Sequence, residues 1–158
     1  MRWHYPDATS YEELFTTCRL LNIPAIEISE QYRRMVFNVI AANVDDHIKN
    51  FSFMMDEKAA WHITPAYDLT FTTHLNGAAY ENGHSLTILG KSRNITVHDL
   101  TQFAKENSIK NEQKIISEVV LAVSHFHEYA LKHHVPPYWA ERIDHHLRHL
   151  CKQIGLHL

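Results

Sequence analysis

The sequence predicts an α+β domain that is mostly helical and carries a small β insert. Apolar residues recur at helical spacing before residue 42 and again after residue 96, whereas the segment between them alternates like short strands. The chain has 158 residues, of which 45% are hydrophobic, enough for a real core. No internal repeat or low-complexity tract divides the chain, so we treat residues 1–158 as one domain.

Two helices are expected in the first quarter of the chain. Ser10 and Glu13 form a capping-box pattern that predicts a helix over residues 11–21. Pro24 lies in the break that follows. A second helix is predicted over residues 29–42, where apolar side chains again repeat at helical spacing.

The middle of the chain is predicted to hold loops and short strands. Residues 43–50 are polar and break the helical pattern, so they indicate a loop. Residues 51–64 read as a hairpin with strands FSFMM and WHIT, and residues 65–71 as a second loop. Residues 74–84 look irregular, and residues 85–89 (SLTIL) predict one more strand.

The remainder, residues 96–158, is expected to be helical. Thr96 and Asp99 bracket a helix start. Residues 112–134 predict one long helix with a single apolar stripe. Two prolines separate it from a last helix whose apolar residues run from Trp139 to Ile154.

Composition excludes several classes of protein. The formal net charge of -3 argues against a basic nucleic-acid surface, so no direct nucleic-acid partner is expected. The two cysteines, Cys18 and Cys151, form no CxxC pair and suggest no disulfide scaffold. No apolar run approaches the roughly 20 residues that span a bilayer. We therefore expect a cytoplasmic, soluble chain without a membrane partner.

Three side chains have the spacing of a phosphotransferase site. Asp45 precedes Asn50 by five residues, and the predicted hairpin then leads to Asp68. Protein kinases place a base Asp, a metal-binding Asn and a second metal-binding Asp in this order. Phosphoryl transfer needs a carboxylate for the attacking hydroxyl and hard oxygen ligands for Mg²⁺. Asp and Asn in a loop can also serve only as turn and cap residues, but the combined spacing favours a kinase site.

The same region resembles a known family. NVDDHIKNFSFM and WHITPAYDLTF, with RRMVFNVIAAN upstream and LTILGKSRNITVHDL downstream, resemble the HipA-like serine/threonine kinases of toxin–antitoxin systems. The resemblance covers roughly residues 10–130. It implies the C-terminal lobe of a protein-kinase-like fold.

The resemblance also implies roles for individual residues. Asp45 matches the catalytic base, and Asn50 and Asp68 match the metal ligands, with Mg²⁺ and ATP as cofactors. His47 and Lys49 occupy fixed-looking places in the motif and are given supporting roles, Lys49 at a phosphate or in steadying the loop. The acceptor would be a serine or threonine of a protein substrate.

Part of the family's machinery has no counterpart in this sequence. No glycine precedes Gly77 and no lysine precedes Lys49, so no phosphate-cradling Gly-rich loop or nucleotide-gripping lysine lies before the motif. We therefore expect the isolated chain to be inactive and to need an upstream kinase lobe. An antitoxin protein is the other expected partner.

Other interpretations stay open at this point. Asp46 competes with Asp45 as the base, although the five-residue spacing to Asn50 favours Asp45. A small-molecule kinase of the aminoglycoside type usually has His two residues before the base, where this chain has Asn43. A non-catalytic binding subunit derived from a kinase is the alternative outside the enzymes.

Some conspicuous residues are expected to be structural. Arg33 and Arg34 are predicted to lie on a solvated helix face or to pair with carboxylates. Tyr67 is expected to pack beside Asp68 rather than to catalyse. His145 and His149 have i, i+4 spacing, but they lack an HExxH pattern and an obvious third ligand, so a solvated cluster is expected instead of a zinc site.

Overall fold

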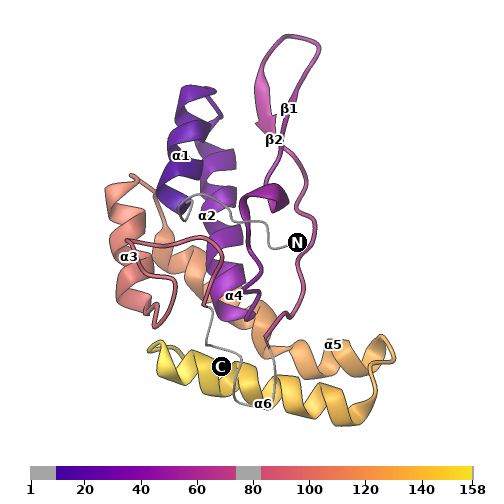
Figure 1. Ribbon diagram of the computed structural model, residues 1–158. Coiled ribbons are helices and arrows are strands. Elements are labelled where there is room, and N and C mark those ends of the chain that lie inside the picture. The colour runs from indigo at the N-terminus through magenta and orange to yellow at the C-terminus, as the bar shows by residue number, and fades with distance from the viewer. Residues whose placement is uncertain (1–9, 74–82, 158) are drawn as a thin grey trace, which may run out of the picture.

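Helix α2 (Ala25–Ile40) is the central element of the fold (Figure 1), because it contacts α1, α4, α6 and β2. The computed structural model describes residues 10–73 and 83–157. Around α2, the other helices and strands are α1 (Tyr11–Leu20), η1 (Ile48–Asn50), β1 (Phe53–Met55), β2 (Trp61–Ile63), α3 (Val97–Glu106), α4 (Glu112–Ser124), α5 (Phe126–Lys132) and α6 (Pro137–Gln153). The mostly helical α+β prediction is thus confirmed.

The capping box predicted at Ser10 is present, and the helix start predicted at Thr96 has one as well. The Ser10 hydroxyl accepts a hydrogen bond from the Glu13 amide, and the Glu13 carboxylate accepts one from the Ser10 amide. Thr96 and Asp99 make the same reciprocal pair at the start of α3. These bonds satisfy backbone donors that the first helical turn would otherwise leave without partners.

Helix α2 begins four residues earlier than the predicted Ser29. Pro24 occupies the N-cap position, and its fixed φ suits the entry to a helix. Ser29 is not a cap: its hydroxyl donates to the Ala25 carbonyl, 3.0 Å away, inside the first turns of the helix. The helix also ends two residues early, at Ile40, and Ala42 adopts a left-handed φ of 56° that turns the chain into the loop.

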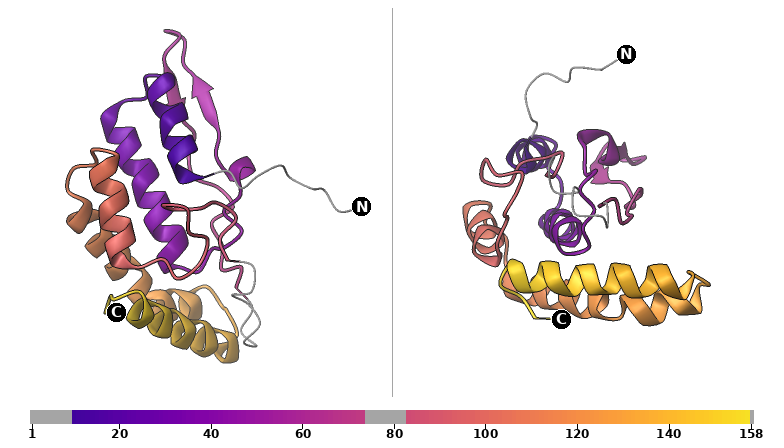
Figure 2. Two further views of the ribbon diagram at one scale, coloured as in Figure 1. Left: turned by 60° about the vertical axis from the view of Figure 1, so that its left-hand side comes forward. Right: turned by 60° about the horizontal axis from the view of Figure 1, so that its bottom comes forward.

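The predicted long helix over residues 112–134 is wrong, because α4 and α5 are separate. At His125 the backbone leaves the helical region, with φ of -90° and ψ of 8°. The Ser124 hydroxyl donates to the Leu121 carbonyl at 2.7 Å, and the His125 ring nitrogen lies 2.8 Å from the same oxygen. These side chains compete with the helical backbone bonds there. Helix α5 then packs along α6 beneath the other helices (Figure 2).

The hairpin is confirmed, but the strand predicted over residues 85–89 is not. Strands β1 and β2 pair antiparallel with Met54 opposite His62, over three residues each. Residues 85–89 contribute only single bridges, from Thr87 to Ser10 and from Ile88 to Lys91. The irregular stretch predicted over residues 74–84 lies mostly outside the described residues.

One core joins α1, α2, α3, α4 and α6. The Phe15 and Phe103 rings meet edge to face with centroids 5.0 Å apart, and the buried Tyr32 hydroxyl donates to the Leu100 carbonyl. Cys18 and Cys151 are both buried and free, as expected. Among the helices of the described residues, none combines the length and the apolar character that crossing a bilayer requires.

A charged cluster fastens the hairpin to α2. The His62 ring nitrogen Nδ1 lies 2.7 Å from one Glu27 oxygen, and the Ile63 amide donates to the other. The hydrogen bond to Glu27, with Asp56 in addition, raises the pKa of His62. Burial alone would raise the pKa of Glu27, but hydrogen bonds from His62 and the Ile63 amide outweigh it and leave that pKa lowered.

We predict that the stability contributed by this cluster is greatest between the ordinary pKa of Glu27, 4.5, and that of His62, 6.5. The contribution of His62 is complete below 6.5 and is lost as pH rises through the raised pKa of the folded state, whereas that of Glu27 is lost as pH falls. Melting temperatures from pH 5 to 9 should decline more in the wild type than in His62→Gln. Parallel curves would contradict this account.

Candidate active site

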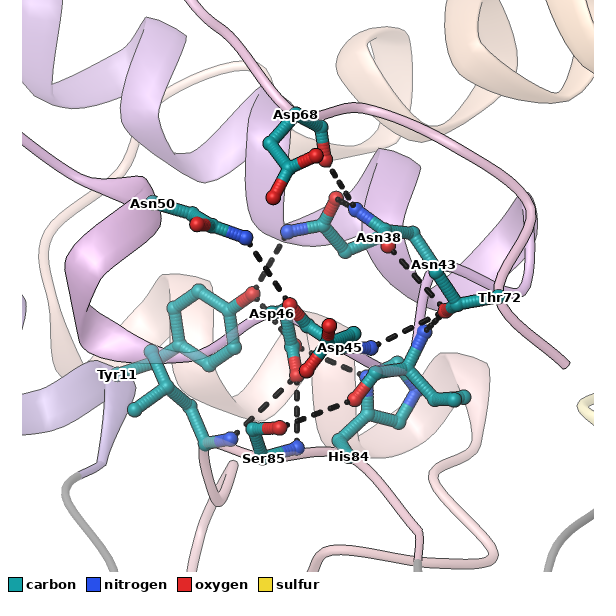
Figure 3. A network of polar contacts seen from close by, with 12 residues as sticks. Tyr11, Asn38, Asn43, Asp45, Asp46, Asn50, Asp68, Thr72, His84 and Ser85 are labelled. Atoms are coloured by element: carbon teal, nitrogen blue, oxygen red, sulfur yellow. Dashed lines mark hydrogen bonds and ion pairs between the residues drawn. The ribbon is translucent and has the colours of Figure 1, made fainter.

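The loop predicted to be catalytic, residues 43–50, is fixed by a buried carboxylate. Asp46 has no exposed surface. Its Oδ2 accepts a hydrogen bond from the Tyr11 hydroxyl at 2.8 Å and lies 2.9 Å from the His84 Nδ1. Its Oδ1 accepts from the backbone amides of Ser85 and Leu86. The loop is thereby joined to α1 and to the segment after residue 83 (Figure 3).

Tyr11 is a donor in this network. Burial, and the charge of Asp46 beside it, raise the pKa of Tyr11 well above 10. The phenol therefore keeps its proton and donates a hydrogen bond to Asp46. Its oxygen in turn accepts a hydrogen bond from the Asn38 amide at 3.0 Å, which brings α2 into the same network.

Two further residues hold the start of the loop. The Asn43 amide donates to the Asn38 side-chain oxygen at 3.0 Å. The Thr72 hydroxyl accepts from the Val44 amide at 2.8 Å and from the Asp45 amide at 3.2 Å. Because Thr72 follows the predicted metal loop, residues 65–71, these bonds connect the two loops.

Both predicted metal ligands line one small cavity, together with Asn38 and Asn43. Asn50 ends the 3-10 helix η1, and its side-chain nitrogen donates to the Asp45 carbonyl at 3.0 Å, so its Oδ1 is left as an acceptor. Asp68 adopts a left-handed φ of 55°, and its backbone carbonyl accepts from Asn43. Figure 3 shows the Asp68 carboxylate pointing toward the Asn38 and Asn50 amides.

Tyr67 links the segment that carries Asp68 to the one that carries Asn50. Its hydroxyl donates to the Lys49 carbonyl at 2.8 Å and lies 2.6 Å from the Ser52 hydroxyl. The side chain is 41% exposed. Its contribution is therefore a hydrogen-bonded bridge between the residues adjoining Asn50 and Asp68, in addition to the packing role expected from the sequence.

The remaining predicted site residues lie at the surface beside this cavity. The Asp45 side chain is 61% exposed, and the His47 Nε2 lies 4.0 Å from its Oδ1. The His47 Nδ1 is buried without a hydrogen-bond partner among the described residues. Lys49 is exposed. Of the five predicted residues, Asn50 and Asp68 share the cavity, whereas Asp45, His47 and Lys49 are not among its lining residues.

Arg34 takes the second of its two expected roles, pairing with a carboxylate, because its Nε lies 4.0 Å from a Glu30 oxygen. Its side chain is not on a solvated face: it is only 11% exposed and lines the same cavity as Asp68. Its Nη2 donates to the Thr64 carbonyl at 2.8 Å. Arg33 does lie at the surface, where it pairs with Glu30 and Glu118.

The described part of the chain contains no separate histidine site for a metal. His145 and His149 are exposed on α6, as expected. Within residues 10–73 and 83–157, no three His, Cys, Asp or Glu side chains are arranged to hold a metal ion. That criterion does not bear on Asn50 and Asp68, because a magnesium site completed by water needs only one carboxylate and one amide oxygen from the protein.

Comparison with family models now adds an independent finding. The HipA-like C-terminal domain model matches residues 2–127, which is most of the chain. The chain belongs to the HipA-like C-terminal domain family. The match agrees with the resemblance placed on residues 10–130 from the sequence. No curated protein matched the chain.

Sequence reasoning missed the residues that support the loops. Asn38 was detectable, because it is a polar residue among the apolar positions of α2, and it proves to be 2% exposed. Tyr11 and His84 gave no such signal, since their partner Asp46 lies 35 and 38 residues away in the chain. Only the folded arrangement reveals that Asp46 is structural.

Asp45 and Asp46 are adjacent, so replacing each in turn tests whether Asp46 is the structural one of the two. Asp46→Ala should lower the free energy of unfolding by about 3–5 kcal/mol, because it leaves Tyr11, His84 and two backbone amides without their acceptor. Asp45→Ala should change it by less than about 0.5 kcal/mol, as expected for an exposed side chain. Urea denaturation followed by circular dichroism measures both. Equal effects would refute the structural assignment of Asp46.

Proposed function

We propose that this chain is the catalytic, metal-binding part of a HipA-like serine/threonine protein kinase, which transfers the γ-phosphoryl group of ATP to a protein hydroxyl. One observation carries the proposal. Asn50 and Asp68, 18 residues apart in sequence, line one cavity while the neighbouring Asp45 carboxylate stays exposed. Membership of the family supports it.

The cavity suits a hard divalent cation. Asn50 offers a side-chain oxygen and Asp68 a carboxylate, which are the ligands that Mg²⁺ prefers. Hydrogen bonds from Asn50 to Asp45 and from Tyr67 to Lys49 hold this side of the cavity in place. When bound, Mg²⁺ would neutralise charge on the ATP phosphates. Asn50 and Asp68 would hold it.

Asp45 is the proposed general base. Its side chain is 61% exposed and open to an acceptor hydroxyl, whose proton it would accept as the oxygen attacks phosphorus. Asp46 is unsuited to this role because both of its oxygens already accept hydrogen bonds inside the fold. We assign Lys49 to a phosphate of the nucleotide or to steadying the loop, and His47 to orienting Asp45.

The proposal includes an upstream kinase lobe as partner. Positioning and electrostatic stabilisation of the phosphates dominate phosphoryl transfer, and the sequence before Asp45 offers neither lysine nor glycine for them. In a toxin–antitoxin system, an antitoxin protein would be the second partner. A kinase-derived binding subunit is the alternative that the activity test below distinguishes.

Metal binding is the first test. The chain should bind Mn²⁺, used as a paramagnetic substitute for Mg²⁺, and Asp68→Asn should weaken binding at least tenfold because a charged ligand is lost. Glu57→Gln, which removes an exposed carboxylate in the hairpin turn, should have no effect. Electron paramagnetic resonance titration measures free Mn²⁺ in each case. Equal affinity in the wild type and Asp68→Asn would exclude this metal site.

Activity is the second test, and it uses the chain together with the upstream lobe of a HipA-like kinase supplied in trans. Transfer of radiolabelled phosphate from ATP to casein should fall about 10²- to 10⁴-fold in Asp45→Asn, the usual loss when a general base is removed. Thermal melts should show the variant folded. Transfer that survives Asp45→Asn would reject Asp45 as base, and a complex that binds ATP without any transfer would favour the binding-subunit alternative.

A further inference from the structure

We propose that Arg34 is a positioning residue for the metal site: its guanidinium ties α2 to the segment that carries Asp68. The inference rests on the proposed function, since it concerns the same cavity. It assigns a role at the site to a residue that the sequence predicted to lie on a solvated face or to pair with carboxylates.

The contacts of Arg34 point to the metal loop. Its Nε lies 4.0 Å from a Glu30 oxygen on α2, and its Nη2 donates to the Thr64 carbonyl over 2.8 Å. Thr64 follows the last residue of β2, and its amide donates to the Ser52 carbonyl, so it closes the hairpin ladder. The chain from Thr64 to Asp68 therefore starts from a point that Arg34 fixes.

The segment from Thr64 to Asp68 needs hydrogen bonds from other parts of the chain to keep its conformation. Asp68 adopts a left-handed φ of 55°, which costs free energy for a residue with a side chain and persists only where the surroundings impose it. Three hydrogen bonds do so: Arg34 to Thr64, Tyr67 to Lys49 and Asn43 to Asp68. Of these, only the first attaches the segment to α2 itself.

Because Arg34 is positively charged, the direction in which its removal changes metal affinity tests the proposed role. Arg34 lines the same cavity as Asn50 and Asp68. A positive charge at this place repels a divalent cation, so its removal should tighten metal binding if only its field mattered. If Arg34 acts by positioning Asp68, its removal should weaken metal binding instead.

Arg33 is the matched control. It carries the same charge on the neighbouring residue of α2, but its side chain is 36% exposed and pairs with Glu30 and Glu118. It is not among the residues lining the cavity. Arg33→Met thus removes an equal charge from the same helix without touching the metal loop.

The experiment compares Mn²⁺ affinity in the full chain of the wild type, Arg34→Met and Arg33→Met. Arg34→Met should weaken binding about tenfold, the lower end for losing a residue that orients a metal ligand. Arg33→Met should stay within about twofold. Amide resonances of Thr64 and of residues 66–69 should shift in Arg34→Met, while those of α3 should not. If Arg34→Met does not fold, Arg34→Lys replaces it, with weaker binding expected at unchanged charge.

The outcomes separate this inference from the proposed function. Unchanged or tighter Mn²⁺ binding by the folded Arg34 variant would overturn the positioning role, even if Asp68→Asn still abolishes binding. Equal weakening by Arg33→Met would also overturn it, because the effect would then follow charge alone. Absence of Mn²⁺ binding in the wild type would reject the metal site and this inference with it.

Discussion

The arrangement of the candidate site depends on one buried carboxylate. Asp46 lies in the middle of the loop of residues 43–50, has no exposed surface, and accepts hydrogen bonds from α1 and from the segment after residue 83. A buried charge of this kind is tolerated only when its acceptor sites are filled. This requirement sets the loop's course, and the preceding residue, Asp45, turns outward. The exposure of Asp45 is a consequence.

Helix α2 is the other element that holds the loops of the site in place. Arg34 and Asn38 lie one turn apart on it, and each reaches a different loop: Arg34 donates to Thr64, and Asn38 connects Tyr11 with Asn43. Residues 43–50 and 65–71 are thus fixed to one rigid helix instead of only to each other. Catalytic groups supported in this way keep their geometry better than groups on free loops.

Local patterns in the sequence predicted the elements whose causes are local. The capping boxes at Ser10 and Thr96 and the hairpin of residues 51–64 were predictable because their determinants lie within a few residues. The break at His125 was not, because an unbroken apolar stripe hides a side-chain contact with the Leu121 carbonyl.

The candidate site also has a part that local patterns predicted and a part that they did not. Spacing alone selected Asn50 and Asp68, which do share a cavity, whereas the buried position of Arg34 depends on a contact with Thr64 that no local pattern records. The most direct test of the central claim is paramagnetic broadening of amide resonances by substoichiometric Mn²⁺. The account predicts that signals of Asn50 and Asp68 broaden together before all others. Broadening confined to His145 and His149 on α6 would contradict it.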